Sequence, residues 1–480
     1  MLNKTVCSWW TMERITDILQ CPSTLLLVLL AGLVFVNFYI KRATCRYPGG
    51  PTPLPLLGNL HQIFYCGCLI KFCEKYRRIH GDVFTFEVGG KKRVVISGYD
   101  AIKELLMDNG QHTKTRSPAS RGKLLTRHYK DTPGMIYASY SSYKRLKSML
   151  IATIKDEGHE LEAKMLQELE DCMSHFIEPS LNKPVNIEQC IALATSNIIN
   201  QLTIGKRFDY CNQTFITLQS SLQEYLRVTI QCGLVSSLPL SDALLGPMVS
   251  RFNHHYEHFS LPTISQLLKE VKSNMNVEGP HYVMERFLAH SQRPVEIQYP
   301  TYSEANAPYF LFQLLLGASD TTSAALRWAF LFIGSNLEVK LKVQQEIDDE
   351  LGQDRLPSFN DLQHMPYVEA VLLETLRRGS IGTLSLPYTL TADCVVKGKL
   401  IPAGSDLMIN FLSVLHDETV FEQPLKFKPE RYLTGNIALK KQRTIPFGIE
   451  IVQLLNFKVY ANICVNKVTE LHLCFTKNHK

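Results

Sequence analysis

The sequence predicts a mainly α-helical protein with a small β region and an N-terminal membrane anchor. Residues 24–40 form a continuous apolar run of the kind that spans a membrane. Helix-type spacing of apolar residues dominates from about residue 101 to residue 378. Short β-type runs flank that region at residues 82–97 and 384–410. The 480-residue chain is 45% hydrophobic, which is typical of a folded protein and not of a disordered one.

Charge and cysteine content narrow the possible functions. The net charge of +6 is modest for this length, and the basic residues are spread along the chain, so no nucleic-acid partner is predicted. The 13 cysteines show no paired spacing, and the cluster of Cys66, Cys68 and Cys73 lacks a second half that would complete a zinc site. We therefore expect reduced thiols in a body that faces the cytosol.

The apolar run TLLLVLLAGLVFVNFYI, at 24–40, is predicted to be a transmembrane signal anchor. Its 17 residues are at the short end of what spans a hydrocarbon core about 30 Å thick. It lies too far from the N-terminus for a clean cleavable signal peptide. Lys41, Arg42 and Arg46 follow it, and the positive-inside rule places the chain after them in the cytosol. The alternative interpretation is a buried core helix.

The segment 41–60 is predicted to be a basic, Pro/Gly-rich hinge between the anchor and the body. Its four prolines exclude a helix, and its three glycines allow sharp turns. Residues 61–449 are predicted to form the body, and residues 450–480 a divergent tail. Within the body, DVFTFEVGGKKRVVIS alternates on both sides of Gly89-Gly90, which predicts a β-hairpin.

One long apolar stretch, FLFQLLLGASDTTSAALRWAFLF, has polar residues at its centre. Glycine and threonine lower helix propensity, and a buried aspartate is costly without a partner. One interpretation is a local distortion around Gly317 that opens room for a ligand, with Asp320 and Thr321 facing it. The alternative is a helix–helix contact made by small residues with a back-bonded threonine.

Three charged residues further along the chain can form a network. Glu374 and Arg377, in VEAVLLETLRR, are three residues apart and lie on one face of a predicted helix, where they can pair. Arg431, in FKPERYL, follows a proline-rich approach. If Arg431 joins the pair, the result is a buried three-residue network that would lock the chain around it.

Together these stretches resemble the microsomal cytochrome P-450 family of haem-thiolate monooxygenases. GASDTT resembles its oxygen-activation motif, ETLR its ExxR helix and FKPERY the third arm of its triad, and the anchor and hinge also fit. The resemblance implies the mainly α P-450 fold with a small β region. It also implies NADPH-dependent insertion of oxygen from dioxygen into a small hydrophobic substrate such as a steroid, fatty acid or xenobiotic.

The resemblance also implies the setting and the residue roles. The protein would be a single-pass protein of the endoplasmic reticulum membrane with a cytosolic body, and would receive electrons from NADPH-cytochrome P-450 reductase. Asp320 and Thr321 would relay protons to iron-bound dioxygen. Glu374, Arg377 and Arg431 would form the structural triad on the proximal side of the haem.

The predicted haem-binding residues depart from the family pattern. The family's WxxxR helix, which helps to hold a haem propionate, corresponds here to YKRLK, with Tyr143 and Lys147 in place of Trp and Arg. Lysine can neutralise a carboxylate, but without the bidentate fork of arginine. Tyr388, in LPYT, stands where many relatives carry a propionate-binding histidine.

The family's cysteine loop, FxxGxRxCxG, is interrupted in this chain. Phe447 and Gly448 fit its start, but Glu450, Val452 and Leu454 stand where Gly, Arg and Cys are expected. The thiolate is the axial ligand whose electron donation favours O–O cleavage, and leucine cannot replace it. The two downstream cysteines, Cys464 and Cys474, lie too far along the chain to take its place.

The break after Ile449 is abrupt, which favours a changed reading frame, a retained intron or an alternative last exon over gradual drift. Three hypotheses follow. By family, the protein is a monooxygenase. Alternatively, it is a catalytically inactive, truncated isoform without thiolate-bound haem, which acts, if at all, by binding lipids or a partner. The third hypothesis is that the chain does not fold stably, since part of the haem site is absent and a bound cofactor would normally add stability. For this chain we expect weak haem binding or none, and no turnover.

Overall fold

The computed structural model describes most of the body. The predicted anchor, residues 41–45 of the predicted hinge and the tail lie outside the described residues. Among the helices that are described, none is long and apolar enough to cross a membrane. The described residues are 46–113, 115–116, 134–180, 187–233, 238, 241–275, 279–292, 300–352, 358 and 360–448.

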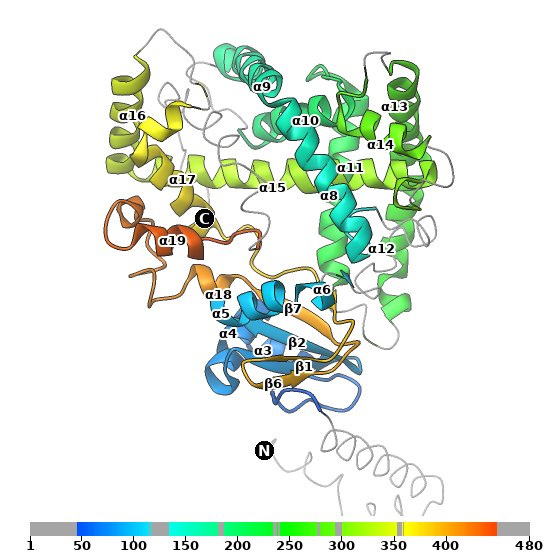
Figure 1. Cartoon of the computed structure of the whole chain (residues 1–480), viewed down its shortest axis with the longest axis vertical. Helices are drawn as coiled ribbons and strands as arrows, with labels where there is room; N and C mark the ends of the chain where they lie inside the picture. The colour runs from blue at the N-terminus through cyan, green and yellow to red at the C-terminus, as the bar shows by residue number, and fades with distance from the viewer. Residues whose placement is uncertain are drawn as a thin grey trace, which may run out of the picture.

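Helices make up most of the described structure (Figure 1), which confirms the predicted mainly α class. The α-helices are α3 (Leu60–Tyr65), α4 (Leu69–His80), α5 (Tyr99–Lys103), α6 (Gly110–Thr113), α8 (Tyr140–Asp156), α9 (Gly158–Cys172), α10 (Ile187–Ile204), α11 (Gln213–Cys232), α12 (Ser241–His255), α13 (Leu261–Ser273), α14 (Val283–Ser291), α15 (Ala307–Ser335), α16 (Leu337–Leu351), α17 (Pro366–Gly379), α18 (Leu412–Leu415) and α19 (Ile437–Arg443). The 3-10 and π-helical turns are η1 (Glu104–Asp108), η3 (Met173–Ile177), η4 (Glu178–Ser180), η6 (Tyr256–Ser260), η7 (Pro300–Tyr302), η8 (Glu304–Asn306), η9 (Asp361–His364) and η10 (Pro429–Tyr432).

Strands from both ends of the body share one sheet, as the sequence predicts. The strands are β1 (Val83–Val88), β2 (Lys91–Ser97), β3 (Thr115–Arg116), β4 (Tyr388–Thr389), β5 (Cys394–Val396), β6 (Lys399–Ile401) and β7 (Asp406–Asn410). The larger sheet has the order β1-β2-β7-β4-β3, and β5 and β6 form a second, two-stranded sheet. The hairpin at Gly89-Gly90 is confirmed, because β1 and β2 pair antiparallel with Val88 opposite Lys91. Strand β7 then pairs parallel to β2.

The longest helix, α15, runs across the middle of the helical part (Figure 1). It is apolar on most of its circumference, as a helix buried on several sides must be. Helix α10 packs along it, and α11, α13, α14 and α17 contact it as well. Phe312 meets the rings of Tyr225 and Tyr256 edge to face, with centroids 5.3 and 5.1 Å away. The core therefore forms around α15.

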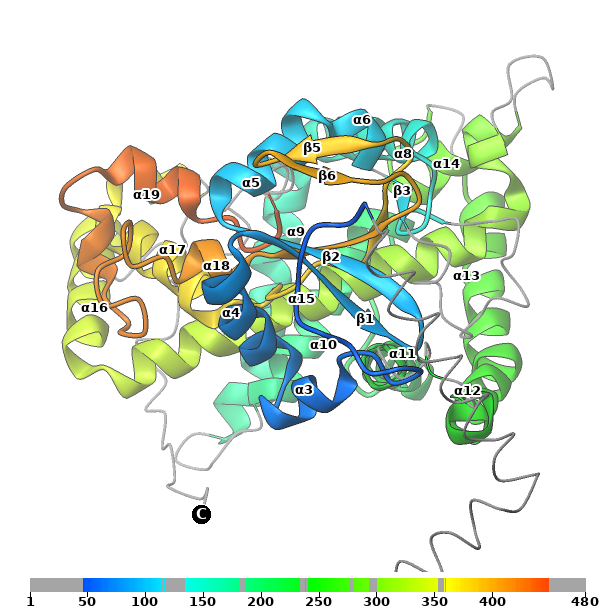
Figure 2. The same ribbon diagram turned by 90° about the horizontal axis from the view of Figure 1, so that it is seen from below.

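The second half of the predicted hinge is docked on the sheet. Figure 2 shows it as the dark blue trace beside β1. Asn59 is fully buried; its Nδ2 donates to the carbonyl of Pro51 (3.2 Å), and its Oδ1 accepts from the backbone N–H of Glu87 (2.7 Å). Gly58 has φ +63°, and a Cβ there would lie 2.1 Å from the Glu87 carbonyl oxygen. These contacts hold Pro51, Gly58 and Asn59 in fixed positions against β1.

Replacing Asn59 should loosen this docking. In Asn59→Ala the buried groups of Pro51 and Glu87 lose their partner, which typically costs about 1–3 kcal/mol. We expect a lower unfolding temperature and faster proteolysis within residues 46–60. His61→Ala, an exposed neighbour, is the matched control. Equal proteolysis of the two variants would show that Asn59 does not hold the segment.

Candidate functional site

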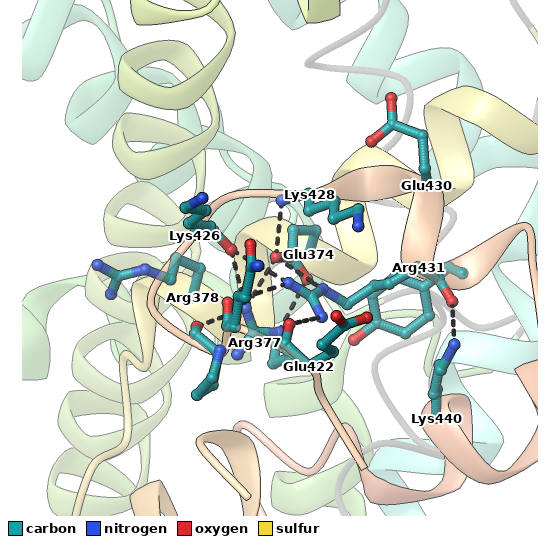
Figure 3. Close-up of polar contacts among 12 residues, drawn as sticks. Glu374, Arg377, Arg378, Glu422, Lys426, Lys428, Glu430, Arg431 and Lys440 are labelled. Carbon is teal, nitrogen blue, oxygen red and sulfur yellow. Dashed lines mark hydrogen bonds and ion pairs between the residues drawn. The ribbon is translucent and has the colours of Figure 1, made fainter. Parts of the chain in front are cut away.

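A buried ionic network joins α17 to the chain that leads into η10 (Figure 3). The side chains of Glu374 and Arg377 are fully buried, and that of Arg431 is 4% exposed. Arg377 donates from Nε and Nη2 to the two carboxylate oxygens of Glu374, at 2.8 Å each. Arg431 donates from Nε to the same carboxylate at 3.1 Å. The structure thus brings the three predicted residues together.

Backbone groups complete this network. The backbone N–H of Lys428 donates to Glu374 Oε1 at 3.0 Å. The remaining guanidinium N–H groups donate to carbonyls of the preceding loop: Arg377 to those of Leu415 (2.7 Å) and Pro424 (2.8 Å), and Arg431 to that of Glu422 (2.7 Å). Buried charges are tolerated only when their hydrogen bonds are satisfied in this way. The network therefore fixes residues 415–428 against α17.

Two further side chains support the network, and neither is marked in the sequence. Glu346 of α16 accepts from the N–H groups of Tyr367 and Val368 (2.9 and 2.7 Å) and so caps the start of α17. It lies among four other acidic residues of α16, so nothing distinguishes it locally. Arg377 also lies over the ring of Phe421, with 5.0 Å between the guanidinium carbon and the ring centroid.

A half-buried histidine lies beside the network. Burial, and then the positive charges of Arg377 and Arg378, lower the pKa of His416 to about 4. This side chain is therefore neutral at physiological pH and adds no third positive charge.

At the centre of α15, the structure disagrees with one of the two interpretations drawn from the sequence. The helix continues without interruption, so the predicted distortion at Gly317 is wrong. Thr321 donates from Oγ1 to the Gly317 carbonyl at 2.7 Å, which is the back-bonded threonine of the alternative interpretation. Tertiary packing on both sides keeps the helix regular despite its weak formers.

Open space nevertheless exists beside this part of α15. Gly317 is exposed, and a Cβ built there meets no atom within 4 Å. Asp320 is half-buried, and burial raises the pKa of its carboxyl; Arg327 opposes this shift and Glu188 adds to it. Arg327 and Glu188 are themselves an ion pair that ties α15 to α10. The room next to Asp320 and Thr321 therefore lies beside an unbroken helix and is wider than one methyl group at Gly317.

The three predicted haem-contacting residues lie on two elements. Tyr143 and Lys147 are one turn apart on α8, and Lys147 Nζ lies 5.9 Å from the centroid of the Tyr143 ring. Tyr388 is half-buried on β4, where it pairs with Arg116 and Leu407. Tyr143 and Lys147 thus lie on one face of α8, while Tyr388 belongs to the β region.

The chain before the interrupted loop is docked between α15 and α17. Phe447 packs against the buried cluster of Ala325 and Leu376, as Ile381 also does. Gly448 has φ +97°, a conformation that favours glycine. The described residues end at Gly448, so Leu454 lies outside them.

Comparison with known proteins agrees with this architecture. The model of the cytochrome P-450 family matches residues 48–449. The chain is 31% identical to cytochrome P-450 2D3 of Rattus norvegicus over 437 residues, which cover 89% of this chain and 86% of that protein. It is 29% identical to cytochrome P-450 2C8 of Homo sapiens over 440 residues, or 90% and 86% of the two chains. This chain belongs to the cytochrome P-450 family. Its fold is accordingly the mainly helical P-450 fold with small β-sheets, and its family is one of haem-iron monooxygenases.

The described residues of this P-450 meet only part of what the family's haem requires. Open space lies beside Gly317, and Lys147 offers a cation for a carboxylate. The loop that begins at Phe447 is described only as far as Gly448, and neither of these two residues carries a sulfur atom. None of the cysteines in the described part of the chain belongs to that loop. The described cysteines are Cys66, Cys68, Cys73, Cys172, Cys190, Cys211 and Cys394.

Removing one arm of the network should destabilise this P-450. Arg377→Ala leaves Glu374 buried and opposed only by Arg431, and breaking a buried pair typically costs about 3–5 kcal/mol. That is a large part of the roughly 5–15 kcal/mol by which a typical protein is stable. We expect a strong fall in membrane-inserted yield and in unfolding temperature.

The matched control for this variant is Arg78→Ala, which truncates an exposed arginine of α4. Arg377→Lys should also destabilise, since an ammonium cannot make the bidentate contact. If the Arg377 and Arg78 variants gave the same yield and melting temperature, the network would not be assembled in solution.

Proposed function

We propose that this P-450 retains the scaffold of a reductase-dependent monooxygenase for a small hydrophobic substrate, such as a steroid, fatty acid or xenobiotic. The observation that carries this proposal is the assembled network of Glu374, Arg377 and Arg431, next to an α15 that presents Asp320 and Thr321 beside open space. The protein would be anchored in the endoplasmic reticulum membrane, with its body in the cytosol and NADPH-cytochrome P-450 reductase as its electron donor.

Asp320 and Thr321 would handle protons in this scaffold. Because burial raises the pKa of Asp320, its carboxyl keeps a proton to higher pH than an exposed aspartate does. The Thr321 hydroxyl uses its hydrogen in the bond to the Gly317 carbonyl, so its oxygen lone pairs remain to accept a bond from a carboxyl or a water. The two groups could thus hold and pass a proton toward the space beside Gly317.

For the chain as it stands we propose a catalytically inactive isoform. The specific observation is Leu454, which occupies the position of the axial cysteine. Tyr143, Lys147 and Tyr388 also replace the family's propionate-binding residues. Such an isoform would act, if at all, by binding lipids or a protein partner of the active P-450s.

The missing sulfur can be tested by spectroscopy. The reduced carbon-monoxide complex of this chain should lack the red-shifted Soret band of thiolate-ligated haem. Replacing the tail after Ile449 with a loop of the form G-x-R-x-C-x-G and its following helix should restore the band. The matched control is the same replacement with serine at the loop cysteine, which should not restore it. A thiolate spectrum from the unmodified chain, abolished by Cys464→Ser, would overturn the proposal.

The proposed membrane topology has an independent test. Protease added to sealed microsomes should digest a tag fused after Lys480, because Lys41, Arg42 and Arg46 would hold the body on the cytosolic side. A resident lumenal protein should stay intact in the same sample. A protected tag would reverse the proposed orientation.

A further inference from the structure

Two buried thiols meet at the interface of α9 and α10. Cys172 is the last residue of α9, and Cys190 lies in the first turn of α10. Their Sγ atoms are 2.7 Å apart, compared with about 2.05 Å for a disulfide bond. The residues are only 6% and 4% exposed, and both cysteines are free. This contact takes no part in the network or in the α15 site.

A polar contact on the same interface holds the two thiols opposite each other. Glu168 lies one turn before Cys172, and Asn197 lies two turns after Cys190. Asn197 Nδ2 donates to Glu168 Oε1 at 2.9 Å, and the Glu168 side chain is fully buried. Since residues four or seven apart share a helix face, both contacts belong to one antiparallel seam. The meeting of the thiols is thus fixed by neighbouring structure.

Further partners anchor Glu168. Arg207 donates from Nε to Glu168 Oε2 at 2.7 Å, and the Tyr210 hydroxyl donates to Oε1. These bonds connect the segment after α10 to α9. A buried carboxylate with this many donors resists displacement, because each lost bond would leave a charge unsatisfied. The seam therefore holds its geometry while a thiol reacts.

The surroundings of this thiol pair do not provide a metal-binding site. Among the residues that the structure describes, no group of three His, Cys, Asp or Glu side chains could hold a metal ion. Zinc in a structural site takes four such ligands. Two thiols in contact can instead be oxidised to a disulfide. We propose that Cys172 and Cys190 are an oxidation site, at which a peroxide converts the two thiols into a disulfide that links α9 to α10.

The reaction balances with the peroxide as the only oxidant. One sulfur attacks a peroxide oxygen, the O–O bond breaks, and a sulfenic acid and one water form. The second sulfur then attacks the sulfenic sulfur, the S–S bond forms, and a second water leaves with the remaining thiol proton. The hydrogen bond to Cys190, and then burial, raise the pKa of Cys172. The reduced pair should therefore react with alkylating agents more slowly than exposed Cys68 or Cys211.

The disulfide would tie an outer helix to the helix that supports the candidate site. Helix α10 packs along α15, which carries Asp320 and Thr321. Linking α9 to α10 also closes the loop between residues 172 and 190 and so restricts the unfolded chain. The oxidised protein should consequently unfold at a higher temperature than the reduced one. This inference needs no bound haem, so it stands or falls independently of the proposed function.

Peptide mapping of the full chain in microsomal membranes tests the proposal. The membranes are treated with hydrogen peroxide and then with N-ethylmaleimide under denaturing conditions. The tryptic peptide 165–206 holds Cys172 and Cys190 and no other cysteine, because its internal Lys183 precedes a proline. We expect this peptide to lose two hydrogen atoms and to carry no maleimide. Cleavage after the glutamates of this peptide, Glu188 among them, should leave the fragments that hold Cys172 and Cys190 joined until a reductant is added.

Cys172→Ser and Cys190→Ser should each abolish the mass loss, whereas Cys211→Ser, the exposed control, should leave it unchanged. Two alkylated thiols or sulfinic acids in the peroxide-treated wild-type peptide would overturn the proposal. So would a disulfide that forms only after the protein has been unfolded in urea.

Discussion

The carboxylate of Glu374 is the point on which the C-terminal half of the described body depends. It is fully buried, and it accepts hydrogen bonds from Arg377, Arg431 and the backbone of Lys428. Arg377 lies on α17 with Glu374, whereas Lys428 and Arg431 lie at the start of η10 and within it, so one side chain joins these two elements. Placing a charge there is expensive, and only a complete set of partners makes the arrangement favourable. Partial assembly is therefore penalised, and the region should form as a unit.

The site beside α15 depends instead on packing that stabilises a helix with weak helix formers at its centre. Helix formation through weak formers such as glycine and threonine costs some stability, and the flanking packing of Phe312 and its neighbours provides the compensation. A Cβ at Gly317 would meet no atom within 4 Å, so the space beside it is wider than one methyl group. Because the helix stays regular, Asp320 and Thr321 have well-defined positions. A distorted helix would offer room but would hold these groups less firmly.

Much of this architecture could be predicted from local sequence pattern, and the exceptions share a cause. Alternation around Gly89-Gly90 is a short-range signal, so the hairpin was predictable, and helical spacing placed Glu374 and Arg377 on one face. Arg431 could be suggested as the third member, but no spacing rule indicated that it would reach Glu374, and only the family motif supported the contact. Contacts between residues that are far apart in the sequence leave no such local pattern. Asn59 and Glu346 act on backbone groups brought near by tertiary structure, and no spacing rule points to them.

The Cys172–Cys190 contact also could not be predicted, since it depends on the packing of two helices and not on cysteine spacing. At Gly317 the opposite happened: a local sequence signal was present, and the prediction drawn from it was wrong. Local propensity suggested a distortion there, and burial on several sides of α15 outweighed it. Local rules thus predict elements well and predict their exceptions poorly.

The contacts that hold the described body of this P-450 together are separate from the residues that catalysis would require. The charges of the network are compensated by the chain's own carbonyls and amides, all of them within residues 374–431. The approach to the interrupted loop is likewise held by apolar contacts of Phe447 with α15 and α17. Neither arrangement requires an atom of the cofactor. A bound haem would add stability by mass action, but it would add to a scaffold that is already consistent. The proposed loss of the axial cysteine would therefore remove the chemistry of the site and leave in place the forces that assemble the described body.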